Sequence, residues 1–182
     1  PGFIFVGRRR IDDTAKPGTY DFRRGFIKSS NTYFITNALR TGVQKIVEIG
    51  HRLHLGEPTY IPTYQDNPGI FPTVKGIQRG WFDGHTANLA IGQGDIAVTP
   101  LHMAVMISTI ANGGKVLYPR LVDRLEQPGA LAGETRRVFP SAQVRDNLGV
   151  QPRHLEVLRA ALLADVDDPD GAGREAAARG VA

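Results

Sequence analysis

The sequence contains no cysteine, which excludes thiol catalysis, disulfide bonds and cysteine-ligated metal sites. It also lacks any run of about 18 apolar residues, so no segment predicts a membrane span, and no signal-like segment opens it. The 182-residue chain begins with Pro and ends with Gly-Val-Ala, as a piece of a longer protein would. We therefore expect that the sequence belongs to a longer parent protein. The absence of a membrane anchor from these residues says nothing about whether that parent has one.

Metal-binding patterns are incomplete. The five histidines are scattered, and no H-E-x-x-H occurs. The aspartates before Gly171 do not form a calcium loop, because a loop opening at Asp165 places Ala176 where the twelfth-position glutamate belongs. The sequence therefore predicts no metal site, and an acidic turn after a helix explains the aspartates.

Nucleotide and nucleic-acid signals are weak as well. Gly92-Gln93-Gly94 begins a loose G-x-G-x-x-A match, but the next helix starts too late to hold a pyrophosphate, and no acidic residue lies about 20 positions on. The run Arg8-Arg9-Arg10 has no interleaved aromatic residues, and the other basic residues are dispersed despite the net charge of +4. We expect no cofactor and no nucleic-acid partner.

What the sequence does contain is the pattern of an α+β domain. Apolar residues make up 41% and charged residues 22%, as in ordinary soluble globular proteins. Apolar periodicity and turn residues predict helices over 21–28, 32–40, 43–54, 100–111 and 154–166, a short strand near 3–6, and a strand pair or bent strand over 115–126. No βαβ period is present, and residues 55–80 read as one long loop.

The helix over 100–111 has the clearest start. Thr99 is placed to cap it and Pro100 to open it, and Asn112 with two glycines ends it. Apolar residues occupy all of its faces, so we expect this helix to be buried nearly all round.

Ser29, Ser30 and Asn31 precede an apolar helical pattern in "KSSNTYF". One interpretation is a helix N-cap, worth about 1 kcal/mol. The other is a reaction centre: no G-x-S-x-G is present, but Ser29-Ser30-Asn31 fits the S-x-N element of lysine-assisted serine acyltransferases.

Longer stretches around this turn carry a family resemblance. "DFRRGFIKSSNTYF" and "NLAIGQGDIAVTPLHMAVMISTIANGGKVLYPRLV" resemble the S-x-N region and the I-G-Q-G…V-T-P-L-Q-M-A…A-N-G-G segment of class B penicillin-binding proteins, in the form of the elongation-type penicillin-binding protein 2. "PGFIFVGRRR" resembles a segment after their S-x-x-K, and "DDPDGAGREAAARGVA" resembles the approach to their K-T-G strand. The resemblance covers nearly the whole chain in the family's order.

Two of the three catalytic elements of that family are absent from this sequence. None of the four serines has a lysine three positions on, and Arg40-Thr41-Gly42, the nearest match to K-T-G, ends a predicted helix. The resemblance therefore implies that residues 1–182 are the central part of one transpeptidase domain. The expected fold is a partial penicillin-binding protein/β-lactamase-like fold, helix-rich, with part of its antiparallel sheet missing.

The resemblance also implies the chemistry. A serine outside this sequence would attack the penultimate D-alanine of a peptidoglycan stem peptide, and an amine from another stem would take the acyl group. Ser29 would relay a proton to the leaving nitrogen, Asn31 would orient the substrate amide, and Ser30 would be structural. The resemblance also implies that these 182 residues alone have no transpeptidase activity.

The implied partners are a stem peptide ending in D-Ala-D-Ala, β-lactams and a cell-wall polymerase of the elongation machinery. The implied parent is membrane-anchored, with this domain in the cell envelope on the periplasmic or outer side. Two alternatives stay open: a non-catalytic interaction or sensor domain of the same fold, and a β-lactamase-like hydrolase in which water replaces the amine.

Overall fold

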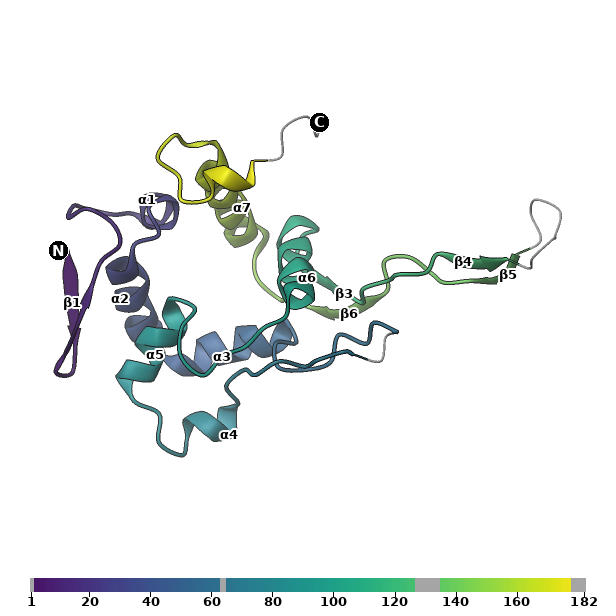
Figure 1. The fold of residues 1–182 in the computed structure, drawn as a ribbon, viewed down its shortest axis with the longest axis horizontal. Helices are drawn as coiled ribbons and strands as arrows, with labels where there is room; N and C mark the ends of the chain where they lie inside the picture. The colour runs from purple at the N-terminus through teal and green to yellow at the C-terminus, as the bar shows by residue number, and fades with distance from the viewer. Residues whose placement is uncertain (1, 63–64, 127–134, 178–182) are drawn as a thin grey trace.

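The computed structural model describes residues 2–62, 65–126 and 135–177, and it has the α+β, helix-rich organisation expected from the sequence (Figure 1). The helices are α1 (Phe22–Ile27), α2 (Asn31–Thr41), α3 (Val43–Arg52), α4 (Val74–Ile77), α5 (Asp83–Ala90), α6 (Pro100–Ala111), α7 (Pro152–Asp167) and the 3₁₀ turn η1 (Arg174–Ala176). The strands are β1 (Phe3–Val6), β2 (Arg9–Asp12), β3 (Lys115–Leu117), β4 (Arg124–Glu126), β5 (Thr135–Val138) and β6 (Val144–Asn147). They form three separate two-stranded antiparallel sheets.

The β1–β2 hairpin packs on α2 and α5 through a small core. Ile4 lies opposite Ile11 in the hairpin register, and both point with Val6 toward the helices because successive side chains of a strand alternate in direction. Val6, Ile35 and Ala87 form the buried centre, which we call the hairpin core; Ile35 and Ala87 are fully buried. This core fixes the hairpin against α2, the helix that begins with Asn31.

A second core joins segments far apart in the sequence. Leu53 and Leu55 follow α3, Leu148 follows β6, and Leu155 lies on α7. The region predicted as a strand pair or bent strand is divided between two sheets: β3 pairs with β6, whereas β4 pairs with β5 in an arm that projects from the body (Figure 1). Pro119 lies between β3 and β4, where it interrupts no ladder.

Helix α6 begins as predicted but is not buried all round. The Thr99 hydroxyl accepts from the His102 N–H at 3.2 Å, and the Thr99 N–H donates to His102 Nδ1 at 3.3 Å, which closes a capping box. His102 is buried, whereas Met103 and Ile107 are 42% and 43% exposed. The burial prediction was therefore wrong, because apolar residues on every face of a helix do not specify which face a neighbour covers. Here α6 contacts β3 and α7, and these neighbours leave Met103 and Ile107 partly exposed.

The two motif look-alikes are turns or helix ends. Arg40 and Thr41 are the last residues of α2, and Gly42 caps it with a φ of +86°, so this tripeptide is not a strand. Gly92 and Gly94 adopt positive φ in a turn well before α6 begins, as a tight-turn reading requires.

The described residues contain no helix long and apolar enough to cross a membrane, and no group of three histidines and carboxylates arranged to hold a metal ion. Residues 178–182, the end of the stretch that resembles the approach to a K-T-G strand, lie outside the described residues.

Candidate functional site

Residues 28–30 form the turn between α1 and α2. Asp21 caps α1 by accepting from the Arg24 N–H at 2.7 Å. At the other end the N–H groups of Ser29 and Ser30 donate to the carbonyls of Phe26 and Gly25, both at 3.0 Å. Ser29 then takes a φ of +49°, a left-handed conformation that few residues other than glycine adopt. The chain thus turns sharply enough to start α2 at Asn31.

Ser30 is the structural member of the turn, as expected. It is fully buried, and its Oγ accepts from the Tyr33 N–H at 3.2 Å, which makes it the N-cap of α2. The same hydroxyl donates to Asp13 Oδ2 at 2.8 Å. Its proton and lone pair are therefore both engaged inside the protein.

Asp13 is a residue that sequence reasoning missed. Its carboxylate accepts from the hydroxyls of Ser30 and Thr32 and from the Ala15 N–H. Burial alone would raise the pKa of this carboxyl, but the hydrogen bonds from Thr32 and Ser30 outweigh burial and hold the pKa below its usual value. The only local signal was an Asp-Asp-Thr turn sequence directly after a strand.

Ser29 and Asn31 lie on either side of Ser30 but differ from it in exposure. Ser29 is exposed, and its carbonyl accepts from the Thr14 hydroxyl. Asn31 is half-buried, and its Nδ2 donates to the Asp12 carbonyl at 3.4 Å. Ser29 is therefore exposed in the turn, and Asn31 begins α2 two residues later.

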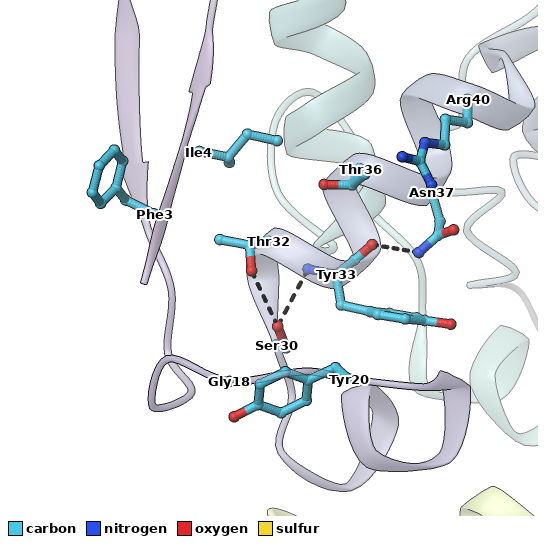
Figure 2. A pocket seen from close by; sticks show the side chains of 10 residues that line it. All are labelled: Phe3, Ile4, Gly18, Tyr20, Ser30, Thr32, Tyr33, Thr36, Asn37 and Arg40. Atoms are coloured by element: carbon cyan, nitrogen blue, oxygen red, sulfur yellow. Dashed lines mark hydrogen bonds between the residues drawn. The ribbon is translucent and has the colours of Figure 1, made fainter. Parts of the chain in front are cut away.

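A cavity of about 420 Å³ opens beside this turn, between the β1–β2 hairpin and α2 (Figure 2). Figure 2 shows Phe3 and Ile4 on the hairpin side and Tyr33, Asn37 and Arg40 along α2. Ser30 and Thr32 reach its wall. Ser29 and Asn31 are not among the lining residues, so the structure does not place them in this cavity.

The stretch after α7 returns to the same turn. Lys28, the residue before Ser29, pairs with Asp170 (Nζ to Oδ2 2.8 Å), and the Ala172 N–H donates to the Ile27 carbonyl at 3.0 Å. The ammonium of Lys28 lowers the pKa of the Asp170 carboxyl. Both contacts bring residues 170–172 beside the end of α1.

Replacing Asp13 by Asn is expected to destabilise the protein in a pH-dependent way. Because the folded-state pKa of Asp13 is depressed, its contribution is present above the ordinary aspartate pKa of about 3.9 and is lost as the pH falls through the folded value. The free energy of unfolding of the wild type should therefore exceed that of Asp13→Asn at pH 7, and the difference should shrink below about pH 4. Urea unfolding of both proteins from pH 7 to pH 3 measures it; a constant difference contradicts the assignment.

A family model described as "Penicillin binding protein transpeptidase domain" matches residues 6–182. The peptidoglycan D,D-transpeptidase MrdA of Salmonella typhimurium is 27% identical over 160 residues, covering 86% of this chain and 25% of that protein. The penicillin-binding protein PbpB of Mycolicibacterium smegmatis is 30% identical over 170 residues, covering 83% of this chain and 26% of that protein.

Solved structures show the same fold. Penicillin-binding protein 3 of Mycobacterium tuberculosis, complexed with aztreonam, superimposes with a TM-score of 0.80 at 28% identity over 98% of this chain and 39% of that one. Penicillin-binding protein 2 of Helicobacter pylori, solved in complex with MreC, gives a TM-score of 0.77 at 23% identity over 99% of this chain and 32% of that one. This chain spans about a quarter of the length of the two curated relatives.

Proposed function

Because the chain belongs to the penicillin-binding protein transpeptidase domain family, we propose that residues 1–182 are the central part of a D,D-transpeptidase domain that cross-links peptidoglycan stem peptides and binds β-lactams. The match over residues 6–182 carries this proposal. The exposed Ser29 and the adjacent Asn31, in a turn whose middle residue is locked by capping, support it.

The reaction is acyl transfer through a serine ester. A nucleophilic serine attacks the carbonyl of the penultimate D-alanine, the C–N bond to the terminal D-alanine breaks, and that amine leaves with a proton. An amine from a second stem peptide then attacks the ester, so that a new amide forms and the serine regains its proton. The nucleophile and its lysine are not in this sequence, which contains no S-x-x-K.

In this scheme Ser29 relays the proton to the leaving nitrogen. A hydroxyl can accept a proton with one lone pair while it donates its own, and the exposed side chain of Ser29 is open to a substrate. Asn31 orients the substrate amide, because its side chain offers both a donor and an acceptor, which a carboxylate does not. A β-lactam enters by the same path, since its ring amide takes the place of the D-alanyl-D-alanine bond.

The proposed setting is the cell envelope, with this domain outside the cytoplasmic membrane in a membrane-anchored protein. The aztreonam complex of the Mycobacterium tuberculosis relative supports β-lactam binding. The complex of the Helicobacter pylori protein with MreC supports a partner from the elongation machinery, which would include a cell-wall polymerase. Both complexes were observed with those relatives, and they motivate the proposal that this protein also binds β-lactams and a partner from the elongation machinery.

A non-catalytic interaction or sensor domain is the second candidate. Replacement of the S-x-x-K serine in the full-length protein would favour it.

Incubation with a labelled β-lactam separates the candidates. We expect the full-length protein to form one covalent adduct per molecule, seen by intact-mass spectrometry, and the 182-residue chain to form none because it lacks the S-x-x-K serine. No adduct on a folded full-length protein would favour the non-catalytic domain. Rapid release of hydrolysed β-lactam would favour the hydrolase, and an adduct on the 182-residue chain would contradict the assignment of the nucleophile.

A further inference from the structure

Three consecutive residues at the end of the hairpin contact the three residues of the S-x-N element, Ser29, Ser30 and Asn31. The Asp12 carbonyl accepts from Asn31 Nδ2 at 3.4 Å, the Asp13 carboxylate accepts from the Ser30 hydroxyl at 2.8 Å, and the Thr14 hydroxyl donates to the Ser29 carbonyl. Each residue of the S-x-N element therefore has one partner among residues 12–14, which we call the 12–14 segment.

Thr32 extends the contact into α2. Its hydroxyl donates to the Asp13 carboxylate, so one carboxyl group holds the N-cap Ser30 and the second residue of the helix together. Thr32 is buried and Asp13 is half-buried, which shields these hydrogen bonds from water. The N-terminal turn of α2 is thus fixed from outside the helix as well as by its own cap.

The 12–14 segment is itself held by packed structure. The Asp13 N–H donates to the Gly2 carbonyl at 2.9 Å, continuing the β1–β2 ladder. The hairpin is fixed to α2 by the hairpin core around Ile35. An Asx-type bond from the Ala15 N–H to Asp13 Oδ1 at 3.3 Å sets the direction of the carboxylate.

We propose that Asp13, assisted by Thr32, is a positioning residue that sets the placement of Ser29 and Asn31 for acyl transfer. This inference rests on the proposed function. Ser29 has a left-handed φ of +49°, a conformation that persists only where its surroundings hold it, and the 12–14 segment supplies those surroundings. Asp13 does not touch the substrate; it acts through Ser30 and the start of α2.

Loss of the Asp13 carboxylate is expected to slow the acylation step itself. A shift of about 1 Å in a reacting group costs on the order of 10²-fold in rate, whereas initial ligand binding depends on contacts spread over the whole site. Asp13→Asn keeps the size of the side chain but replaces one acceptor oxygen by a donor. The Ser30 and Thr32 hydroxyls donate to Oδ2 and the Ala15 N–H donates to Oδ1, so a neutral amide loses one of these two acceptor positions and weakens the bonds that remain.

The test is stopped-flow acylation of the full-length protein by a fluorescent β-lactam, with the acylation rate constant separated from the dissociation constant of the first complex. We expect Asp13→Asn to lower the rate constant about 10- to 100-fold with little change in the dissociation constant. Thr32→Val, which keeps the shape and removes the hydroxyl, should lower it in the same direction, and Thr32→Ser should restore it. Because the two groups share one interaction, the double variant should lose less than the product of the single losses.

Asp66→Asn is the matched control. Asp66 also accepts three hydrogen bonds, from the N–H and hydroxyl of Thr59 (3.0 and 2.9 Å) and from the Tyr60 N–H (2.6 Å), but it has no contact with the turn. Its replacement should lower the melting temperature and leave the rate constant unchanged.

Wild-type rate constants in Asp13→Asn and Thr32→Val would overturn the inference while leaving the proposed function in place. An equal loss in Asp66→Asn would also overturn it, since general destabilisation would then explain the effect. Absence of any adduct on the wild-type protein would remove the proposed function and this inference with it. If Asp13→Asn does not fold, the Thr32→Val and Thr32→Ser pair decides the outcome.

Discussion

Replacing Ser29 by Ala in the full-length protein is expected to slow acylation by a β-lactam about 10²- to 10⁴-fold, the usual contribution of a positioned proton-transfer group. The residue is exposed and lies in a turn held by backbone hydrogen bonds, so loss of its hydroxyl should leave the fold intact. The leaving nitrogen would then lose the hydroxyl that relays a proton to it. Acylation kinetics with a chromogenic β-lactam measure the effect.

Substitution of Asn31 should also slow acylation, but for a different reason. Asn31→Asp keeps the size of the side chain but removes its donor, so a substrate amide would lose one of two hydrogen bonds. We expect acylation to fall on the order of 10²-fold, as for other losses of substrate orientation. Both variants lose the Nδ2 donor to the Asp12 carbonyl, and Asn31→Ala, which also removes the acceptor oxygen, should be at least as slow.

Ser141→Ala is the matched serine control, because Ser141 is exposed in a loop between β5 and β6. It should acylate at the wild-type rate. Wild-type acylation rates in both Ser29→Ala and Asn31→Asp would contradict the roles assigned to Ser29 and Asn31. A normal melting temperature in each variant would show that a slower rate does not come from loss of folding.

Ile35→Ala is expected to lower the free energy of unfolding by about 2–5 kcal/mol, the range for large-to-small substitutions in a packed core. Ile35 is fully buried and joins α2 to the β1–β2 hairpin and α5. Removing its side chain leaves a cavity that these three elements cannot all close together. Chemical denaturation of the wild type and the variant gives the value.

Ile49→Ala on α3 is the matched control for that experiment. Ile49 is 38% exposed, so its truncation removes less buried surface, and alanine is the stronger helix former. We expect Ile49→Ala to lower the free energy of unfolding by much less than Ile35→Ala does. Similar losses at the two positions would mean that the hairpin core does not hold α2 as described.

Local features were the part of the fold that could be predicted. The starts of the helices at Ser30 and Thr99 follow from side chains that cap N–H groups three residues away, and the structure has both caps. The termination of α2 at Gly42 likewise depends on one residue's backbone freedom. Helices α4 and α5 were missed because they are short and carry little apolar periodicity.

Features that join distant segments could not be predicted in this way. The periodicity of α6 is apolar on all sides, yet Met103 and Ile107 are exposed, since the neighbours rather than the helix decide which face is covered. The strand pattern after α6 was visible, but β3 pairs with β6 across a hairpin arm, a choice made by packing over about 30 positions.

The candidate site likewise has features that the sequence predicted and features that depend on the tertiary structure. The sequence by itself determined the family resemblance, the S-x-N turn and the presence of a helix N-cap among Ser29, Ser30 and Asn31, because these depend on residue identity and on hydrogen bonds within a few residues. Only the tertiary structure decided that Asp13, 17 residues before Ser30, holds that turn, and that Asp170 returns to Lys28. Side chains so far apart meet only when a core such as that around Ile35 has fixed their backbones, and no local pattern encodes that distance.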